Sequence, residues 1–280
     1  MPHPAFNAQG VAVITGGASG IGLATATRFA QMGMKIAIVD LGEDRLAAAA
    51  DKLRAAGAAE VLTSETDVSE VAAMHQLNDL VTDKLGGATI LMNNAGIQTG
   101  SSMFSAHEGW ERVVAVNMWG PINGSEAFVP GMLERGHPGL VINTGSKQGI
   151  TTPPGDPAYN MSKSGLKTFT EALEHHLRNI EGAKITAHLL IPGFVFTELT
   201  QGDRTEKPAG AWTPEQTADF MIECLERGDF YILCPDNDVS RALDEKRMAW
   251  AMGDIIENRP PLSRWHADYA GPFSDYLSKS

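Results

Sequence analysis

The sequence predicts an α/β fold: a doubly wound, mostly parallel sheet of seven strands with helices on both faces. Seven short apolar runs alternate with segments of helical spacing along the 280 residues, as is typical of parallel sheets that are buried on both sides. Residues with reactive or hydrogen-bonding side chains follow several of these runs. Sheets of this kind bind ligands beyond the carboxyl ends of their strands, so we expect a site there.

The apolar runs and the helical segments follow one another in regular order. In chain order, the expected strands are Val11–Thr15, Lys35–Asp40, Val61–Asp67, Thr89–Met92, Leu140–Thr144, Lys184–Ile191 and Phe230–Cys234. The expected helices are Ile21–Met32, Leu46–Ala56, Val71–Leu85, Trp110–Glu134, Ala158–Arg178 and Pro214–Glu226. Apolar residues recur every three or four positions in the helices, whereas the strands are short and continuously apolar. Two further segments look irregular, Thr197–Trp212 and Asp236–Ser280.

The length and composition predict one globular domain, residues 1–280, in which 236–280 forms an extended C-terminal tail. The formal net charge of −12 makes nucleic acids and anionic membranes unfavourable partners. The chain has no apolar run that is long enough to span a bilayer. Met1–Gly10 lacks the pattern of a signal peptide. Cys224 and Cys234 lie in apolar stretches and read as buried free thiols, so we expect a cytoplasmic protein.

A glycine-rich turn joins the first strand to the first helix, as in Rossmann-type folds. Gly16 permits the tight turn, Gly20 leaves room for a pyrophosphate, and Gly22 allows the helix and the strand to pack closely. The N-terminus of the helix offers free N–H groups to phosphates. With Ser19 and Ile21, these glycines form the predicted dinucleotide cradle.

Asp40 closes the second strand, 18 positions after Gly22. A carboxylate at this point can accept hydrogen bonds from both hydroxyls of a ribose and repels a 2′-phosphate. Leu41 follows it, and Gly17–Ser19 contains no cation that could hold such a phosphate. We therefore expect NAD as the cofactor, with an NADP-dependent carbonyl reductase as an alternative.

Tyr159 and Lys163 lie four residues apart on a predicted helix and so share one face. An ammonium near a phenol favours the phenolate, which would let the tyrosine exchange a proton with an alcohol or carbonyl oxygen near neutral pH. Ser146 follows the fifth strand and can donate a hydrogen bond to a developing alkoxide. These three side chains predict hydride-transfer chemistry beside a nicotinamide.

From Val11 to Thr197 the chain resembles the short-chain dehydrogenase/reductase family. The segments that carry the resemblance, in order, are Thr15–Gly22, Asn93–Gly96, Asn117, Ser146, Tyr159–Lys163 and Pro192–Gly193. The resemblance implies that Asp67 and Val68 hold the adenine. It also implies that Asn94, Ala95 and Gly96 form the turn behind the adenine ribose.

The resemblance implies further roles near the reacting carbon. Asn117 would hold a water molecule in a proton relay that runs through Lys163, and Lys163 would also bind the nicotinamide ribose. Pro192, Val195 and Thr197 would lie in the loop that grips the carboxamide. Without the resemblance, Asn117 reads as an ordinary capping or core amide.

The substrate pocket is expected beside this loop and the segments that follow the fourth and fifth strands. Ile150 and Phe194 would contribute an apolar wall, and Gln98 and Gln148 would add hydrogen bonds. We therefore expect a hydrophobic or aromatic secondary alcohol or ketone. Lys147 could bind an acidic group, although an exposed lysine is the simpler interpretation.

Two alternatives to this reaction stay open. One is a reaction that keeps NAD bound throughout, such as epimerisation, and the other is a non-catalytic nucleotide-binding or scaffold protein. We expect no metal, because the adjacent residues His175 and His176 point in different directions on their helix. We expect a homo-oligomer, either a dimer or a tetramer. The aromatic tail could fold over the sheet edge or the mouth of the active site, on its own subunit or on a neighbour.

Overall fold

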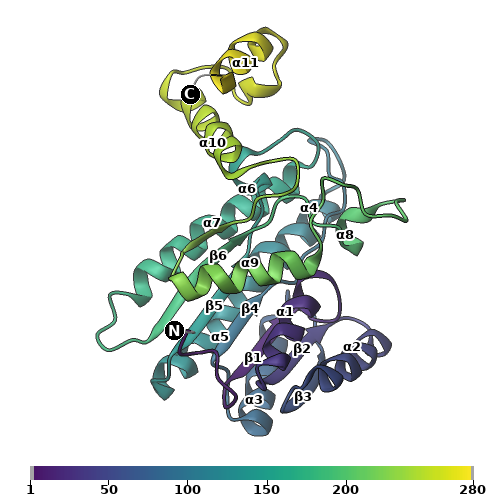
Figure 1. Cartoon of the computed structure of the whole chain (residues 1–280), viewed down its shortest axis with the longest axis vertical. Helices are drawn as coiled ribbons and strands as arrows, with labels where there is room; N and C mark the ends of the chain where they lie inside the picture. Colours follow the sequence, from purple (N-terminus) through teal and green to yellow (C-terminus); the bar gives the residue numbers. More distant parts are fainter. Residues whose placement is uncertain (1–2, 279–280) are drawn as a thin grey trace.

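The computed structural model describes residues 3–278 and has the predicted doubly wound architecture (Figure 1). Its strands are β1 (Val11–Thr15), β2 (Lys35–Asp40), β3 (Glu60–Glu65), β4 (Ile90–Asn93), β5 (Gly139–Thr144), β6 (Ile185–Ile191) and β7 (Tyr231–Leu233). They form one sheet in the order β3-β2-β1-β4-β5-β6-β7, and every neighbouring pair is parallel. The order reverses between β1 and β4, which opens a crevice at the strand ends.

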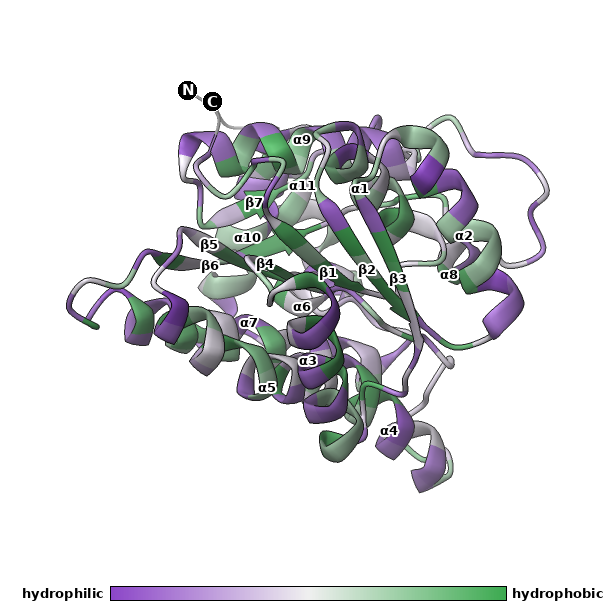
Figure 2. Cartoon of the chain, turned by 90° about the horizontal axis from the view of Figure 1, so that it is seen from below, coloured by the Kyte–Doolittle hydropathy of each residue, from purple (hydrophilic) through white to green (hydrophobic). Residues whose placement is uncertain are grey.

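Helices cover both faces of the sheet (Figure 2). One layer consists of α1 (Gly20–Gln31), α2 (Glu43–Ala56) and α9 (Pro214–Arg227). The other layer consists of α3 (Val71–Leu85), α5 (Gly120–Arg135) and α7 (Pro157–Leu177). Strand β1 shows why both layers are needed. Ala12 and Ile14 pack into the core on one face, and Val11 and Val13 pack into the core on the other, because successive side chains alternate across a strand.

The helix predicted over Trp110–Glu134 is divided in the structure. It consists of α4 (His107–Val114), a π-helical segment at Ala115–Trp119, and α5. Pro121 near the start of α5 cannot donate a backbone hydrogen bond to the preceding turn, which favours an irregularity at this point. The wider π turn contains Asn117, and π segments are frequent at functional sites.

The tail that was predicted to be irregular is largely helical, which corrects that expectation. It contains α10 (Arg241–Ile256), two short 3₁₀ turns and α11 (Ala270–Ser278). We call residues 240–278 the arm, because they project beyond the end of the sheet in Figure 1. The arm has its own small core, in which Trp250 lies edge-on to Phe273 at 5.2 Å between ring centroids and beneath the guanidinium of Arg259 at 4.1 Å. Aromatic contacts at irregular spacing stabilise it, and these are difficult to recognise from periodicity.

Two shorter helices were also not expected. α6 (Gln148–Thr151) follows β5, and α8 (Glu198–Gln201) lies within the polar segment after β6. Among the described residues, no helix is long and apolar enough to cross a membrane. Cys224 and Cys234 are buried and free, as predicted.

Candidate active site

A cleft of about 470 Å³ follows the carboxyl ends of the strands at the point where their order reverses. All but two of the predicted catalytic and cofactor-binding residues line it. They are Gly16, Ser19, Gly20, Ile21, Asp40, Asp67, Val68, Asn94, Ala95, Gly96, Ser146, Tyr159, Lys163, Pro192, Val195 and Thr197. The remaining two, Gly22 and Asn117, are buried directly behind the wall of the cleft.

The glycines of the β1–α1 turn are required by the backbone itself. Gly16 and Gly20 have positive φ angles of 62° and 51°, which other residues rarely adopt. A side chain at Gly22 would place its Cβ 2.1 Å from the carbonyl oxygen of Gly16. The turn therefore stays tight, and the first N–H groups of α1 remain available at the floor of the cleft.

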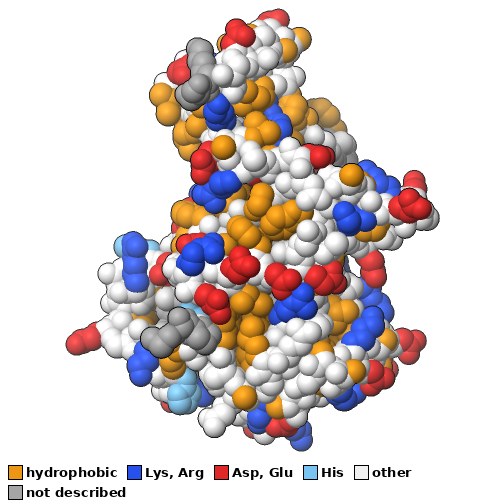
Figure 3. Space-filling view, in the orientation of Figure 1, with side chains coloured by type: hydrophobic (Ala, Val, Ile, Leu, Met, Phe, Trp, Pro, Cys, Tyr) orange, Lys and Arg blue, Asp and Glu red, His pale blue; other side chains and the backbone are white. Residues whose placement is uncertain are grey.

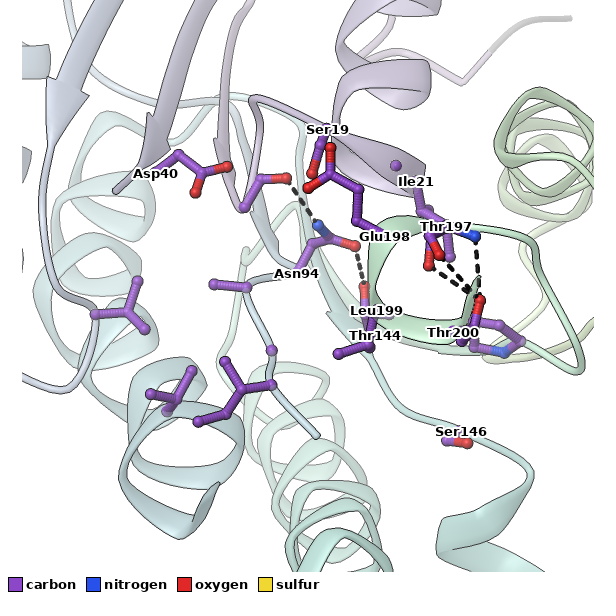
Figure 4. Close-up of a pocket in the computed structure, with 18 of the residues that line it drawn as sticks. Ser19, Ile21, Asp40, Asn94, Thr144, Ser146, Thr197, Glu198, Leu199 and Thr200 are labelled. Atoms are coloured by element: carbon purple, nitrogen blue, oxygen red, sulfur yellow. Dashed lines mark hydrogen bonds between the residues drawn. The ribbon is translucent and has the colours of Figure 1, made fainter. Parts of the chain in front are cut away.

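Asn94 holds three strand ends together behind this turn (Figure 4). Its side-chain amide donates to the carbonyl oxygens of Thr15 and Gly16, at 3.1 and 3.3 Å, and its carbonyl oxygen accepts from the Thr144 hydroxyl at 3.2 Å. The hydroxyl of Thr15 accepts hydrogen bonds from the backbone N–H groups of Asn94 and Ala95. Such a fully bonded network fixes the relative positions of β1, β4 and β5.

Asp40 lies at the end of β2 with its carboxylate fixed by the backbone. One oxygen accepts from Ala18 N at 3.0 Å and the other from Leu41 N at 2.8 Å. Asp67 lies nearby and pairs with Arg112 at 3.2 Å. Burial opposes the charged form of Asp67, but hydrogen bonds from Ser69 and the charge of Arg112 together hold its pKa below the ordinary value. This end of the cleft is therefore anionic and well ordered.

The opposite end of the cleft brings Ser146, Tyr159 and Lys163 together. Ser146 lies close enough to the phenol of Tyr159 to lower its pKa. The ammonium nitrogen of Lys163 lies 5.7 Å from the centroid of the Tyr159 ring and donates to the Thr144 carbonyl oxygen at 2.7 Å. The four-residue spacing on α7 thus places the two side chains on one face, and the loop after β5 supplies the serine.

The start of α7 is fixed by Asp156, which the sequence analysis did not identify. Its carboxylate caps the helix by accepting from Tyr159 N at 3.3 Å, and it also accepts from the N–H groups of Gly100 and Ser101. Burial opposes its charged form, but these hydrogen bonds lower the pKa of Asp156. An acidic N-cap followed by Pro157 is a recognisable helix start, so this signal was present in the sequence.

The pKa of Tyr159 differs from the sequence-based expectation. Burial raises it to about 12, although the nearby Ser146 side chain opposes this change. Burial also lowers the pKa of Lys163 to about 8. Desolvation disfavours the charged form of each group, so the protein by itself keeps the phenol protonated.

Asn117 lies close to this group from the π segment. Its side chain pairs with the backbone of Ile97, accepting from N at 2.8 Å and donating to O at 2.8 Å. A Cβ added at Gly96 would lie 3.3 Å from the Asn117 side-chain oxygen and 3.6 Å from the Lys163 nitrogen. The bare backbone of Gly96 thus leaves space between Asn117 and Lys163.

The loop after β6 forms a further wall of the cleft, next to the walls formed by the β1–α1 turn and by α7. Thr197 is the N-cap of α8, and its backbone N–H and its hydroxyl are hydrogen-bonded to the Thr200 hydroxyl at 3.1 and 3.3 Å (Figure 4). Val195 pairs with Trp212 in an isolated parallel bridge. These contacts fix the backbone of Thr197–Trp212, the segment that was predicted to be irregular.

The four residues expected in the substrate pocket do not line this cleft. Gln98 is exposed, and Gln148 begins α6. Ile150 packs towards an apolar cluster that contains Leu233, on the side of α6 that faces the arm, and Phe194 lies 5.7 Å from the guanidinium carbon of Arg204. Loop residues cannot be assigned to one side of a short helix from sequence order alone, which explains the difference.

Lys147 also differs from its expected exposed position. Its ammonium lies 3.4 Å from Asp236 and 2.5 Å from Asp244, and only 17% of its side chain is exposed. It therefore belongs to a buried ion triad and is not free to bind a ligand. The partners follow Lys147 by 89 and 97 residues, so no local pattern could reveal them.

Arg45 and Arg112 are cleft residues that the sequence analysis missed. Arg45 pairs with Glu198 at 2.8 Å. Both arginines come from helices, α2 and α4, and neither belongs to a motif or directly follows a strand, so no local pattern marks them. Among the described residues, no group of His, Cys, Asp and Glu could hold a metal ion.

The cleft lies where the strand order reverses, with a glycine cradle at one end and a tyrosine beside a lysine at the other. This combination characterises dinucleotide-binding oxidoreductases. The chain belongs to the short chain dehydrogenase family, whose model matches residues 10–208. It is 32% identical to 1-deoxy-11-beta-hydroxypentalenate dehydrogenase of Streptomyces exfoliatus, over 92% of this chain and 95% of the relative.

Solved structures of the family agree with the fold. A short chain dehydrogenase/reductase from Burkholderia phymatum in complex with NAD has a TM-score of 0.82 and 32% identity, over 92% of this chain and 97% of that one. The alcohol dehydrogenase of Thermococcus sibiricus, complexed with 5-hydroxy-NADP, has a TM-score of 0.69 and 26% identity, over 77% and 90%. The chain is therefore an oxidoreductase of a family that uses nicotinamide dinucleotides.

Proposed function

We propose that the protein uses NAD to interconvert a secondary alcohol and a ketone, with Ser146, Tyr159, Lys163 and Asn117 as its catalytic set. The observation that carries this proposal is that Ser146, the buried phenol of Tyr159 and Lys163 come together in the cleft, with the Lys163 nitrogen 5.7 Å from the centroid of the Tyr159 ring. Two hydroxyls that meet at one point suit a substrate oxygen that changes between hydroxyl and carbonyl.

The residues present fit a dinucleotide. The glycine cradle and the N-terminus of α1 suit the pyrophosphate, and the fixed carboxylate of Asp40 suits the two hydroxyls of the adenine ribose. Asp67 and Val68 would hold the adenine. Lys163 would hold the nicotinamide ribose, and Pro192, Val195 and Thr197 the carboxamide. The volume of about 470 Å³ is sufficient for such a ligand.

When NAD is bound, its nicotinamide supplies the acceptor or donor of the hydride. In the oxidation direction, Tyr159 accepts the hydroxyl proton of the substrate, and Ser146 donates a hydrogen bond to the same oxygen. Because burial raises the pKa of Tyr159 to about 12, phenolate needs added positive charge nearby. The Lys163 ammonium can supply part of it, and the space between Lys163 and Asn117 suits a water molecule that passes the proton onward.

The preference for NAD follows from Asp40. A 2′-phosphate at this position would meet a carboxylate that two backbone N–H groups already fix, and like charges at such distances repel. Arg45 is the specific observation in favour of the NADP alternative, because it lines the same end of the cleft. Its ion pair with Glu198 reduces the positive charge that a phosphate would meet.

The relatives support a substrate with a hydroxyl group on a carbon skeleton. The Streptomyces enzyme is named for an 11-beta-hydroxy compound. Leu199 gives the cleft apolar surface, as does Ile97, which packs against the cluster that contains Tyr159, and such surface suits a hydrophobic alcohol or ketone.

The test is a panel of hydrophobic secondary alcohols, assayed with NAD and with NADP by the absorbance of the reduced nicotinamide. We expect turnover with NAD and a kcat/KM at least about 10-fold lower with NADP. Asp40→Ala should decrease the preference for NAD over NADP, because it removes the carboxylate that repels a 2′-phosphate. Binding of NAD without turnover of any alcohol or ketone would instead indicate a nucleotide-binding protein without this activity.

A further inference from the structure

A second hollow of about 440 Å³ lies outside the cofactor cleft, between α6 and the arm. Ile150, Thr151 and Thr152 form its wall on the body of the protein. The arm contributes apolar and aromatic side chains, among them Trp250 and Trp265. Figure 3 shows hydrophobic side chains gathered at the base of the arm, with cationic side chains among them. Pockets of this size and composition accommodate small organic molecules.

Two arginines, Arg247 and Arg264, line this hollow and also a smaller cavity of about 60 Å³. Within residues 3–278, neither arginine has a salt bridge, and Nε of Arg247 is buried without a hydrogen-bond partner. Burial and the charge of Arg247 hold the pKa of Arg264 below its ordinary value, although the charge of Asp244 opposes this shift. Two like charges side by side in an apolar hollow are unfavourable unless an anion binds them.

The acidic residues around the hollow form their ion pairs with other cations, although the charge of Asp244 also acts on Arg264. Asp244 pairs with Lys147 at 2.5 Å, and Asp254 pairs with Arg259 at 2.9 Å. Arg264 instead stacks on aromatic rings, with its guanidinium carbon 4.7 Å from the Trp265 ring. Acidic residues outnumber basic residues in this chain by 34 to 22. Two neighbouring arginines that form no salt bridge are therefore unusual in it.

We propose that this hollow, the arm pocket, binds a small organic carboxylate through Arg247 and Arg264. The guanidiniums would take the carboxylate by charge-assisted hydrogen bonds, and Ile150, Trp250 and Trp265 would cover an apolar or aromatic body. The carboxylate could belong to a free acid that acts as an effector, or to the far end of the substrate itself.

The position of the arm pocket connects it to the reaction. Its wall begins four residues after Ser146, and Lys147, the residue directly after that serine, belongs to the ion triad that holds the arm. A ligand that draws α6 and the arm together would therefore act on the segment that carries Ser146. The effect of the ligand on the reaction depends on the proposed oxidoreductase function, whereas the binding of a carboxylate in the arm pocket does not.

Direct binding tests the arm pocket without any turnover. Phenylbutyrate and its neutral amide are titrated calorimetrically into the full chain, with tryptophan fluorescence as a second readout because two tryptophans line the pocket. We expect phenylbutyrate to bind at least about 10-fold more tightly than the amide. The double variant Arg247→Gln/Arg264→Gln should lose that difference. The single variant Arg247→Lys should keep most of it, because it retains the charge.

A matched control lies on the same helix. Arg241 on α10 is exposed and pairs with Glu245 at 2.8 Å, so Arg241→Gln should bind phenylbutyrate like the wild type. The unliganded double variant should melt at or above the wild-type temperature, because it lacks the unpaired charges, and NAD binding checks that it is folded. Equal affinity for acid and amide, or undiminished binding by a folded double variant, would overturn the proposal.

Turnover assays then distinguish the two sources of the carboxylate. If it belongs to the substrate, hydroxy acids should have a lower KM than their methyl esters, and the double variant should abolish this advantage. If it belongs to an effector, phenylbutyrate should change the rate with a neutral alcohol in the wild type but not in the double variant. Failure of all turnover would contradict the proposed function and leave the binding result intact.

Discussion

At the scale of single residues, the reaction centre depends on two buried groups whose charged forms are both disfavoured. Tyr159 has a raised pKa of about 12, and Lys163 has a lowered pKa of about 8. The sequence predicted the pairing of these residues through their four-residue spacing. It could not predict the direction of the Tyr159 shift, because desolvation depends on the burial that the whole fold creates.

The lowered pKa of Lys163 predicts a stability that depends on pH. An ordinary lysine in the unfolded chain titrates near 10.5, so the folded state is penalised while both states hold the proton. This decrease in the free energy of unfolding is complete below about pH 8, where Lys163 is protonated in both states, and it disappears towards pH 10.5. Between about pH 7.5 and 9.5, the free energy of unfolding of wild type relative to Lys163→Met should increase by roughly 2 kcal/mol. Urea unfolding at both pH values measures this, and a pH-independent difference would contradict it.

Gly22 predicts a steric effect at the floor of the cleft. Gly22→Ala would bring a Cβ to 2.1 Å from the Gly16 carbonyl oxygen, so the turn must move. We expect a loss of about 1–3 kcal/mol in stability, together with weaker NAD binding. Gly271→Ala is the control, because a Cβ at that glycine meets no atom within 4 Å. Thermal unfolding and NAD titration of both variants test the prediction, and it is wrong if Gly22→Ala resembles the control.

At the scale of elements, the loop that carries Ser146 is tied to the arm by the ion triad of Lys147, Asp236 and Asp244. The carboxylates are 8% and 7% exposed. Buried ion pairs cost a great deal when one partner is removed, because the remaining charge loses its compensation. The triad therefore holds α6 and the start of α10 in one arrangement.

Removal of one carboxylate should loosen the arm before it loosens the sheet. In Asp244→Asn, we expect hydrogen exchange in α10 to become at least about 10-fold faster, whereas exchange in β1 and β4 stays unchanged. Glu245→Gln is the matched control on the same helix, since Glu245 forms an exposed pair with Arg241. Equal exchange of α10 in the two variants would show that the triad does not hold the arm.

The elements also show what sequence patterns can and cannot reveal. The seven strands and the turn at Gly16–Gly22 were predicted, because short apolar runs and glycine spacing are local signals. The division of the helix around Asn117 and the fold of the arm were not. The π turn replaces a helical pattern of nearly the same periodicity, and the arm is held by Trp250 contacts between residues far apart in the chain.

At the scale of the whole molecule, the arm leaves apolar side chains in contact with solvent. Ile255 and Ile256 are 77% and 76% exposed near the end of α10. A projecting helix with such side chains is typical of a contact between subunits. The expectation of a homo-oligomer therefore stays a prediction, with the arm as its first candidate interface.

Substitution of these isoleucines tests that prediction. In the double variant Ile255→Asp/Ile256→Asp, we expect a smaller mass in solution than that of the wild type, because aspartates cannot be buried at an apolar contact. Phe104→Asp is the control, since Phe104 is fully exposed in a loop distant from the arm in sequence. Light scattering coupled to gel filtration measures the masses. An unchanged mass for the double variant would exclude this part of the arm as an interface.

The most direct test of the central claim is the turnover of Tyr159→Phe with NAD and a hydrophobic secondary alcohol that the wild type oxidises. The substitution removes only the phenol hydroxyl, which lies beside Ser146 in the cleft. We predict a decrease in kcat of about 1,000-fold or more, with the Kd for NAD within about 2-fold of the wild-type value. A variant that keeps kcat within about 10-fold of the wild type would contradict the assignment of Tyr159 as the proton-transferring group.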